Sequence, residues 1–95
     1  MSAYWISTYD EIHDEEKLAT YATLAGPAIT EAGGRFLARS VAEVVYESTS
    51  KNRTVVVEFD SVEAAVAAHD SAAYQAALDA LGDGVTRGIR IVPGV

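Results

Sequence analysis

The sequence predicts a small α+β domain, and three observations lead to this fold class. The chain has 95 residues, of which 49% are hydrophobic and 22% charged, so its composition and length fit one globular domain covering residues 1–95. Segments with the two-residue alternation and β-branched content of strands recur along it. Between them lie longer segments with apolar residues at helical spacing. We therefore expect a single layer of strands packed against helices.

The first third of the chain predicts a strand followed by a helix. Residues 3–9 mix aromatic, β-branched and small polar residues with a rough period of two, as a strand does. From Asp14 to Ala32 the apolar residues recur at helical spacing. Pro27 lies inside this helix and should kink or interrupt it, because proline lacks the N–H of the helical ladder. Gly33 and Gly34 then end the helix.

Two strands follow, joined by a polar turn. Residues 35–39 and 41–47 predict a second strand that bends in its middle. Residues 48–52 are polar and predict a turn. Residues 54–59, Thr-Val-Val-Val-Glu-Phe, form the clearest strand pattern of the chain. We expect these strands to form a hairpin.

The last third predicts an interrupted helix and a final strand. Ser61 is a suitable N-cap, and the helix that it opens should break at Asp70-Ser71. A second helical piece begins near Ala72 and should stop at the glycines of residues 82–84. Residues 85–92 predict the last strand.

The order strand, helix, strand, strand, helix, strand is the split βαβ arrangement of the ferredoxin-like fold. It predicts a four-stranded antiparallel sheet with the helices on one face. The strand segments also contain Trp5, Val44 and Tyr46, which is more apolar surface than one face readily uses. We expect the uncovered face to pack against a second copy, giving a homodimer. The indole of Trp5 either lines a pocket or fills this interface, and we favour the interface.

Charge and composition exclude several classes of function. The formal net charge of -7 repels phosphate backbones and anionic lipid surfaces, so we expect no nucleic acid and no membrane as a partner. The chain has no cysteine, and no stretch is apolar for long enough to span a bilayer. Without a basic, apolar leader pattern, the expected location is cytoplasmic. The cluster His13-Asp14-Glu15-Glu16 suits a helix N-terminus better than a metal site, so we expect no metal.

His69 is the candidate catalytic residue. Helical spacing places it on the face that looks toward the sheet, where a half-buried imidazole could act as a general acid or base near neutral pH. The alternative is a structural histidine whose nitrogens bind the backbone. Asp70 follows it directly, but neighbouring residues on a helix point in different directions, so a pair cannot be assumed.

Four further residues are candidates for substrate binding. Arg39 and Glu58 are charged residues in otherwise apolar strands, so they either pair with each other or leave Arg39 free to bind the carboxylate of a small acid. Tyr21 and Tyr74 lie on the inward stripes of their helices. Their rings would form the roof of a pocket, and their buried hydroxyls need partners in the protein or on a ligand.

Several short stretches, in this order and spacing, resemble an uncharacterised family called domain of unknown function 1330. The stretches are Tyr4-Trp5-Ile6, Tyr21 with residues 24–29 (Leu-Ala-Gly-Pro-Ala-Ile), residues 33–39 (Gly-Gly-Arg-Phe-Leu-Ala-Arg), Val57-Glu58-Phe59 with Ser61, and Asp70-Ser71 with residues 74–78 (Tyr-Gln-Ala-Ala-Leu). The resemblance implies the dimeric α/β-barrel superfamily and its dimer. It implies no particular reaction, because the superfamily includes cofactor-free monooxygenases, muconolactone-type isomerases and haem-dependent enzymes.

Two functions therefore remain open. The first is a cofactor-free enzyme, oxygenase-like or isomerase-like, that acts on a small organic molecule with His69 as acid or base and no bound cofactor. The second is a non-catalytic module that binds a small ligand or assembles with itself. Haem binding is a weaker third alternative, because His13 and His69 are the only histidines and only His69 is well placed.

Overall fold

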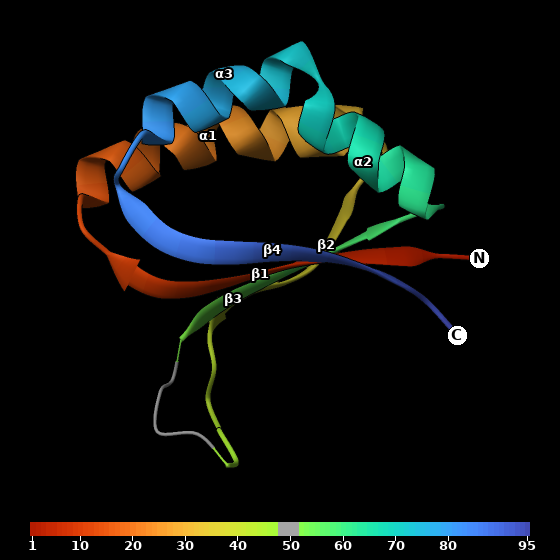
Figure 1. The fold of residues 1–95 in the computed structure, drawn as a ribbon, viewed down its shortest axis with the longest axis horizontal. Helices are drawn as coiled ribbons and strands as arrows, with labels where there is room; N and C mark the ends of the chain where they lie inside the picture. Colours follow the sequence, from red (N-terminus) through yellow and green to blue (C-terminus); the bar gives the residue numbers. More distant parts are fainter. Residues whose placement is uncertain (48–51) are drawn as a thin grey trace.

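The chain folds into a four-stranded antiparallel sheet with helices on one of its faces (Figure 1). The computed structural model describes residues 1–47 and 52–95. The elements in these ranges are β1 (Ala3–Ile12), α1 (Glu15–Glu31), β2 (Arg35–Val41), β3 (Arg53–Phe59), α2 (Val62–Asp70), α3 (Ala72–Leu81) and β4 (Val85–Pro93). The strand order is β2-β3-β1-β4, so β1 and β3 are the central strands. The predicted ferredoxin-like α+β fold is confirmed.

Local capping explains where α1 begins. The carboxylate of Asp14 accepts hydrogen bonds from the backbone N–H groups of Glu16 and Lys17, both at 3.0 Å, and acidic residues occupy the first turn. The helix continues through Pro27, so the predicted interruption does not occur. Pro27 has no N–H group and so cannot form the usual helical hydrogen bond to the carbonyl of Thr23. Thr23 is exposed, so solvent can bind that carbonyl instead.

Ser71 joins α2 to α3 and confirms the predicted break. Its hydroxyl donates to the carbonyl of Ala68 at 2.8 Å and accepts from the backbone N–H of Tyr74 at 3.2 Å, so one side chain ends one helix and begins the next. Ser61 caps α2 in the predicted way by accepting from Ala64 at 3.0 Å. In the described part of the chain, none of the helices is long and apolar enough to cross a membrane.

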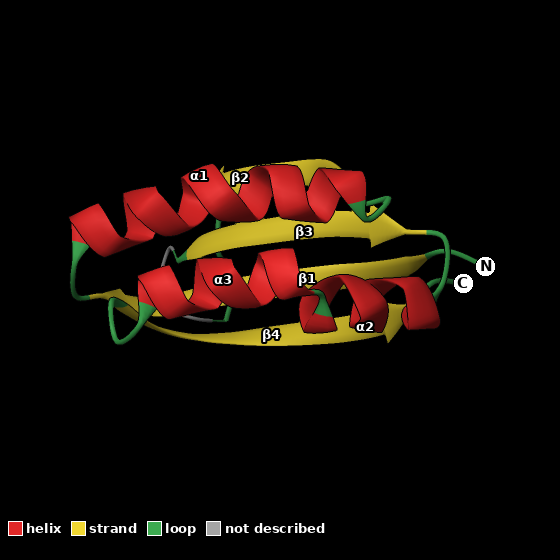
Figure 2. Cartoon of the chain, turned by 90° about the horizontal axis from the view of Figure 1, so that it is seen from above, coloured by secondary structure: helices red, strands yellow, loops and turns green. Residues whose placement is uncertain are grey.

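Figure 2 shows how the helices divide the sheet between them, with α1 along the β2 and β3 side and α3 and α2 in line over β1 and β4. Trp5 lies beneath them with 1% of its surface exposed. The prediction that Trp5 fills a dimer interface is therefore wrong. Alternation along β1 turns Ala3, Trp5, Ser7 and Tyr9 toward the helices, and the helices already cover that face.

The second strand is shorter than predicted. It ends at Val41, and the residues after it carry exposed apolar side chains instead of adding to the sheet, with Val44 66% and Tyr46 84% exposed. The strand predicted for residues 41–47 is wrong because β2 is an edge strand whose only neighbour, β3, begins at Arg53. The predicted turn at residues 48–52 falls largely outside the described residues.

Gly34 allows the end of α1 to approach β3 closely. A Cβ atom at this position would lie 2.6 Å from Cγ2 of Ile29 and 2.9 Å from side-chain atoms of Phe59 and Val57. These are fully or almost fully buried core residues, so they have little room to move. The absence of a side chain at Gly34 thus sets the distance between α1 and the sheet.

We predict that Gly34→Ala lowers the free energy of unfolding by about 2 kcal/mol, because it overpacks the core. Gly26→Ala is the matched control, since a Cβ atom added there would meet no atom within 4 Å and the residue stands inside α1. That control should raise stability by about 0.5 to 1 kcal/mol through helix propensity. Urea unfolding measures both. Equal stabilities of the two variants would contradict the close approach at Gly34.

Candidate functional site

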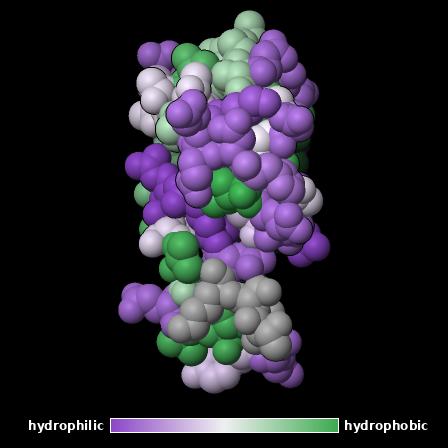
Figure 3. Space-filling model, turned by 90° about the vertical axis from the view of Figure 1, so that its left-hand side faces the viewer, coloured by the Kyte–Doolittle hydropathy of each residue, from purple (hydrophilic) through white to green (hydrophobic). Residues whose placement is uncertain are grey.

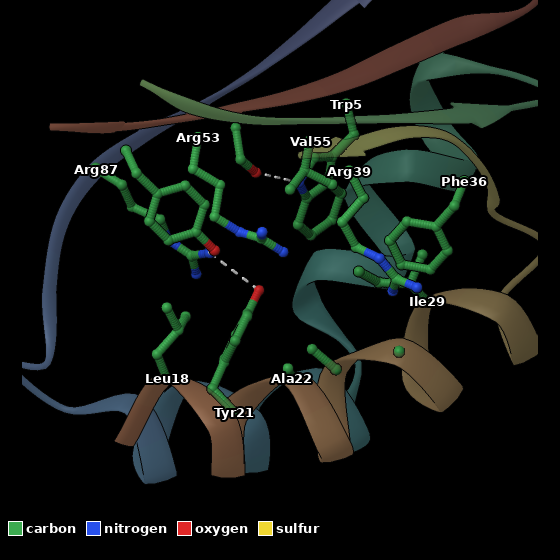
Figure 4. A pocket seen from close by; sticks show the side chains of 14 residues that line it. Trp5, Leu18, Tyr21, Ala22, Ile29, Phe36, Arg39, Arg53, Val55 and Arg87 are labelled. Carbon is green, nitrogen blue, oxygen red and sulfur yellow. Dashed lines mark hydrogen bonds between the residues drawn. The ribbon is translucent and has the colours of Figure 1, made fainter. Parts of the chain in front are cut away.

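A pocket lies between α1 and the helix-facing side of the sheet (Figure 4). Its cavity volume is about 60 Å³, and one side opens to solvent. Apolar and aromatic side chains form most of its walls, and three arginines enter it. The residues that line it are Trp5, Ser7, Tyr9, Leu18, Tyr21, Ala22, Ala25, Gly26, Ile29, Phe36, Arg39, Arg53, Val55 and Arg87.

Small residues on α1 create the space. Ala22, Ala25 and Gly26 follow Tyr21 on the side of the helix that borders the pocket, and their short side chains leave room above the sheet. Tyr21 itself extends from α1 toward the strands, so its hydroxyl reaches the polar end of the pocket (Figure 4). The small residues of α1 thus leave space for a ligand, and Tyr21 on the same helix supplies a hydrogen-bonding group beside that space.

The three arginines come from three different strands, with Arg39 on β2, Arg53 on β3 and Arg87 on β4. None of them forms a salt bridge with a carboxylate within residues 1–47 and 52–95. Nε of Arg53 is buried and has no hydrogen-bond partner there. The guanidinium of Arg39 lies over the ring of Phe36, with its central carbon 4.5 Å from the ring centre. The pocket therefore concentrates positive charge.

Phenol hydroxyls surround Arg87 where a carboxylate would be expected. Its Nη1 donates to the hydroxyls of Tyr9 at 2.8 Å and Tyr21 at 3.1 Å, and its Nη2 donates to that of Tyr74 at 3.2 Å. The hydroxyls of Tyr21 and Tyr74 are themselves 2.6 Å apart. Burial alone would lower the pKa of Arg87, but the three phenols raise it, so the guanidinium stays charged.

Burial raises the pKa of Tyr9 and, more strongly, that of Tyr74, which keeps both phenols neutral over the ordinary pH range. Among the described residues that line the pocket there is no carboxylate, histidine or lysine. The pocket thus offers cations and neutral hydroxyl groups. This arrangement is chemically suited to a negatively charged group.

The structure brings together three of the residues predicted from the sequence. Tyr21 and Arg39 line the pocket, and Tyr74 lies directly behind Tyr21 as its hydrogen-bond partner. Tyr74 is fully buried and touches Trp5 edge to face, with ring centres 5.0 Å apart. The prediction that both tyrosines point inward is confirmed by their burial.

His69 lies outside the pocket, behind two aromatic rings. Its ring centre is 5.8 Å from that of Trp5 and 5.3 Å from that of Tyr74. Its Nδ1 is 3.0 Å from Oδ1 of Asp70, so these sequence neighbours do meet. The imidazole can therefore influence the pocket only through Trp5 and Tyr74, and its catalytic role stays a prediction.

Glu58 lies on the opposite face of the sheet from the pocket. Its carboxylate accepts from Nε of Arg35 at 3.1 Å, while Nη2 of Arg35 donates to Asp60 at 3.1 Å. The proposed pairing of Glu58 with Arg39 is wrong. Regular alternation from Arg35 would put Arg39 on the face of Glu58, but a register shift between Phe36 and Ala38 turns Arg39 inward, opposite Val55.

Sequence reasoning missed Tyr9, Arg53 and Arg87, although the strand alternation carries a signal for each. Arg53 is in phase with the inward residues Val55, Val57 and Phe59, and Arg87 is in phase with Ile89 and Ile91. Tyr9 is in phase with Trp5 in the same way. An arginine in phase with core residues is an inward-facing cation, which is a stronger indication of a site than its charge alone.

The acidic cluster at the start of α1 caps the helix, as expected. Within the ranges that the structure describes, no group of three or more histidine, aspartate and glutamate side chains is placed to hold a metal ion.

Residues 2–95 match the model of the family described as Domain of unknown function (DUF1330). The chain belongs to this family. No curated protein matches the sequence. The confirmed resemblance covers almost the whole chain, so the fold and the pocket both lie within the region shared with the family.

Solved structures with the same fold include proteins of known and unknown role. A protein of unknown function from Rhodopseudomonas palustris is 15% identical, with a TM-score of 0.78 over 99% of this chain and 82% of that one. The cofactor-independent oxygenase SnoaB from Streptomyces nogalater is 8% identical, with a TM-score of 0.70 over 99% of this chain and 93% of that one. A protein of the EthD family from Bacillus halodurans is 14% identical, with a TM-score of 0.65 over 100% of both chains. These likenesses show the ferredoxin-like α+β fold.

We predict that Arg35, and not Arg39, controls the ionisation of Glu58. The hydrogen bond from Arg35 lowers the pKa of Glu58 below its ordinary value. Since the folded-state pKa lies below the unfolded one, this pair stabilises the fold fully above the unfolded pKa, and the contribution is lost as the pH falls through the folded pKa. Arg35→Gln should raise the pKa of Glu58 in a carbon NMR titration. A comparable rise in Arg39→Gln would contradict the register described for β2.

Proposed function

We propose that this protein binds a small organic anion in the pocket between α1 and the sheet. The observation that carries the proposal is the entry of Arg39, Arg53 and Arg87 into one pocket with no salt-bridging carboxylate among the described residues. Arg53 and Arg87 are partly buried, and guanidinium groups that leave bulk water without a counter-ion are unfavourable, whereas Arg39 remains exposed to solvent. A carboxylate or a comparable oxyanion would supply the missing charge and accept the unused N–H groups.

The walls support an organic rather than an inorganic anion. Trp5, Leu18, Ile29 and Phe36 present apolar surface around the arginines, which suits carbon atoms attached to the acidic group. A cavity of about 60 Å³ takes an acidic group and a few carbon atoms, so a larger body would extend through the open side.

The charge distribution supports a localised site. The protein has a formal net charge of -7, so its surface as a whole repels anions. The pocket reverses this sign over a short distance, and salt screens the charges of Arg53 and Arg87 less because these two residues are partly buried. Anion binding here therefore depends on the pocket residues and not on a general attraction.

Chemistry on the bound anion is the further function that the pocket supports. Oxygenation and isomerisation of an organic acid can both proceed through an enolate or carbanion, and fixed cations stabilise that charge. The likeness in fold to a cofactor-independent oxygenase is in keeping with this, and the protein would then be a cofactor-free enzyme. His69 remains the proposed acid or base, and because no hydrogen bond among the described residues links it to the pocket, this role requires the substrate itself to come within hydrogen-bonding reach of the imidazole. If the unaltered protein converts a bound organic acid and the His69→Ala variant does not, the result would support catalysis by His69. If the unaltered protein leaves the acid unchanged, the protein is a non-catalytic binding module.

We predict that benzoate and acetate bind the protein and that benzamide and acetamide bind far more weakly. Trp5 is the only tryptophan and lines the pocket, so its fluorescence reports occupancy directly. Arg53→Gln should weaken the binding of benzoate about tenfold or more, because it removes a charge-assisted hydrogen bond of about 1.5 to 3 kcal/mol.

Lys17→Gln is the matched control. It removes one positive charge, but Lys17 lies on the surface and pairs with Asp83 at 2.7 Å. The affinity of the Lys17→Gln variant for benzoate should equal that of the unaltered protein. Equal binding of benzoate and benzamide, or an equal loss in the two variants, would show that the pocket does not select anions.

We also propose that two copies form a homodimer through the sheet face that the helices leave uncovered. Ile6 and Val56 pair across β1 and β3 on that face and are both partly exposed, and Val92 on β4 is 42% exposed. The segment after β2 extends to the same side of the sheet (Figure 1). Val44 belongs to this segment and is 66% exposed. Figure 3 shows hydrophobic surface at the end of the molecule where the segment lies. A second copy would cover the face and the segment together.

We predict that Val56→Glu converts the dimer to a monomer at micromolar concentration, because it places a charge at the centre of the proposed interface. Val66→Glu is the control, since Val66 lies on α2 and is 43% exposed on the far side of the molecule. Analytical ultracentrifugation gives the mass of each. A monomeric unaltered protein, or a dimeric Val56→Glu variant, would exclude this interface.

A further inference from the structure

The hydroxyl groups around Arg87 have more protons than acceptors. Tyr9, Tyr21 and Tyr74 each accept a hydrogen bond from Arg87, and each has one O–H proton of its own to donate. One proton is used between Tyr21 and Tyr74. Within the described residues the other two have no acceptor, so this cluster is a set of donors that faces the pocket.

Burial decides which protons are free. Tyr74 is fully buried and does not line the pocket, and its hydroxyl has no acceptor in the described chain other than Tyr21. If Tyr21 donated to Tyr74, the proton of Tyr74 would be left unpaired in the interior, which is unfavourable. Tyr74 therefore donates to Tyr21. The free protons are those of Tyr9 and Tyr21, which both line the pocket.

Two more donors lie in the same lining. Nε of Arg53 is buried without a partner in the described chain, and the guanidinium carbon of Arg53 lies 5.9 Å from the ring centre of Tyr9. Arg87 lies 5.3 Å from the same ring centre, so Tyr9 has a guanidinium within reach on each of its neighbouring strands. The hydroxyl of Ser7 accepts from Nε1 of Trp5 at 3.0 Å and has its own proton left to donate. Figure 4 shows Arg53 and Tyr21 extending toward each other from the sheet and from α1.

We propose that the hydroxyls of Tyr9 and Tyr21, together with Arg53, form an oxyanion-binding site for the carboxylate of an organic acid. In this arrangement Arg87 acts on the ligand through the two tyrosines. Its Nη1 protons are already donated to Tyr9 and Tyr21, so it fixes the orientation of both hydroxyls and makes them stronger donors. Arg87 and Tyr74 are positioning residues, and the inference deepens the anion-binding function proposed above and rests on it.

The proposed site should also select carboxylates over neutral amides. A carboxylate has acceptors only and can take two or three donors at once. A neutral amide of the same shape brings its own N–H donors to a site that already consists of donors, and one of them would remain unpaired. The site should therefore reject amides by geometry as well as by charge.

Phenylalanine substitutions test the proposal with the loss of one oxygen atom each. Benzoate is titrated into Tyr9→Phe, Tyr21→Phe and Tyr74→Phe, with Trp5 fluorescence as the readout and thermal unfolding as the check on folding. Tyr9→Phe and Tyr21→Phe should each weaken the affinity about tenfold. Tyr74→Phe should weaken it by less than about threefold, because Tyr21 keeps its free proton. Tyr4→Phe is the matched control on the opposite face and should have no effect.

A second variant and a second readout make the outcome decisive. Arg53→Lys keeps the charge but removes the Nε donor, so its affinity should fall between those of the unaltered protein and Arg53→Gln. The Nε–H signal of Arg53 in nitrogen NMR spectra should shift on addition of benzoate.

The possible failures can be told apart. If neither benzoate nor acetate binds the unaltered protein, both this inference and the proposed function are wrong. If benzoate binds in an Arg53-dependent manner but Tyr9→Phe and Tyr21→Phe bind it normally, only this inference is wrong. A tighter complex with Tyr74→Phe would show that Tyr21 donates to Tyr74, and it would overturn the assignment of the free protons.

Discussion

Arg87 extends from β4 into the layer between the sheet and the helices, and the hydroxyls of Tyr9, Tyr21 and Tyr74 take the place of a carboxylate around it. These three tyrosines belong to β1, α1 and α3, so one guanidinium connects four elements. A carboxylate partner would have neutralised the charge and closed the pocket to anions. Phenols satisfy the N–H groups but leave the charge, and the positive character of the whole pocket depends on that difference.

The fold could be predicted largely because its signals are local. Asp14, Ser61 and Ser71 cap the helices through hydrogen bonds to residues two or three positions away, and such patterns are visible in a sequence. The end of β2 depends on a distant residue. Its β-branched run continues past Val41, but the partner strand begins only at Arg53, and no local pattern contains that fact.

The site was predictable in part, for the same physical reason. Tyr21 and Tyr74 follow helical periodicity and are found where it places them. Arg39 reaches the pocket only because of a register shift in β2, and a shift of one residue moves a side chain to the other face of a sheet. Hydrophobicity alone places Trp5 on the wrong face, because it ignores the phase of β1. Phase also identifies Arg53 and Arg87, whereas charge alone draws attention to Glu58 on the opposite face.

Ligand binding and stability should be coupled in this protein. The strands hold Arg53 and Arg87 partly buried without a salt-bridging carboxylate among the described residues, which is electrostatically unfavourable, and a bound anion would offset that cost. An anion bound to the folded state alone therefore stabilises it by mass action, in addition to any packing that it adds. The net charge of -7 makes anion binding unfavourable over most of the protein surface. The pocket, where hydrogen-bond donors outnumber acceptors, is therefore the favoured place for an anion. Many proteins share this arrangement of sheet and helices, so the fold alone does not specify a ligand. In the proposed site, the hydroxyl and guanidinium donors would select an acceptor-rich, negatively charged group, and they would therefore define the ligand more narrowly than the fold does.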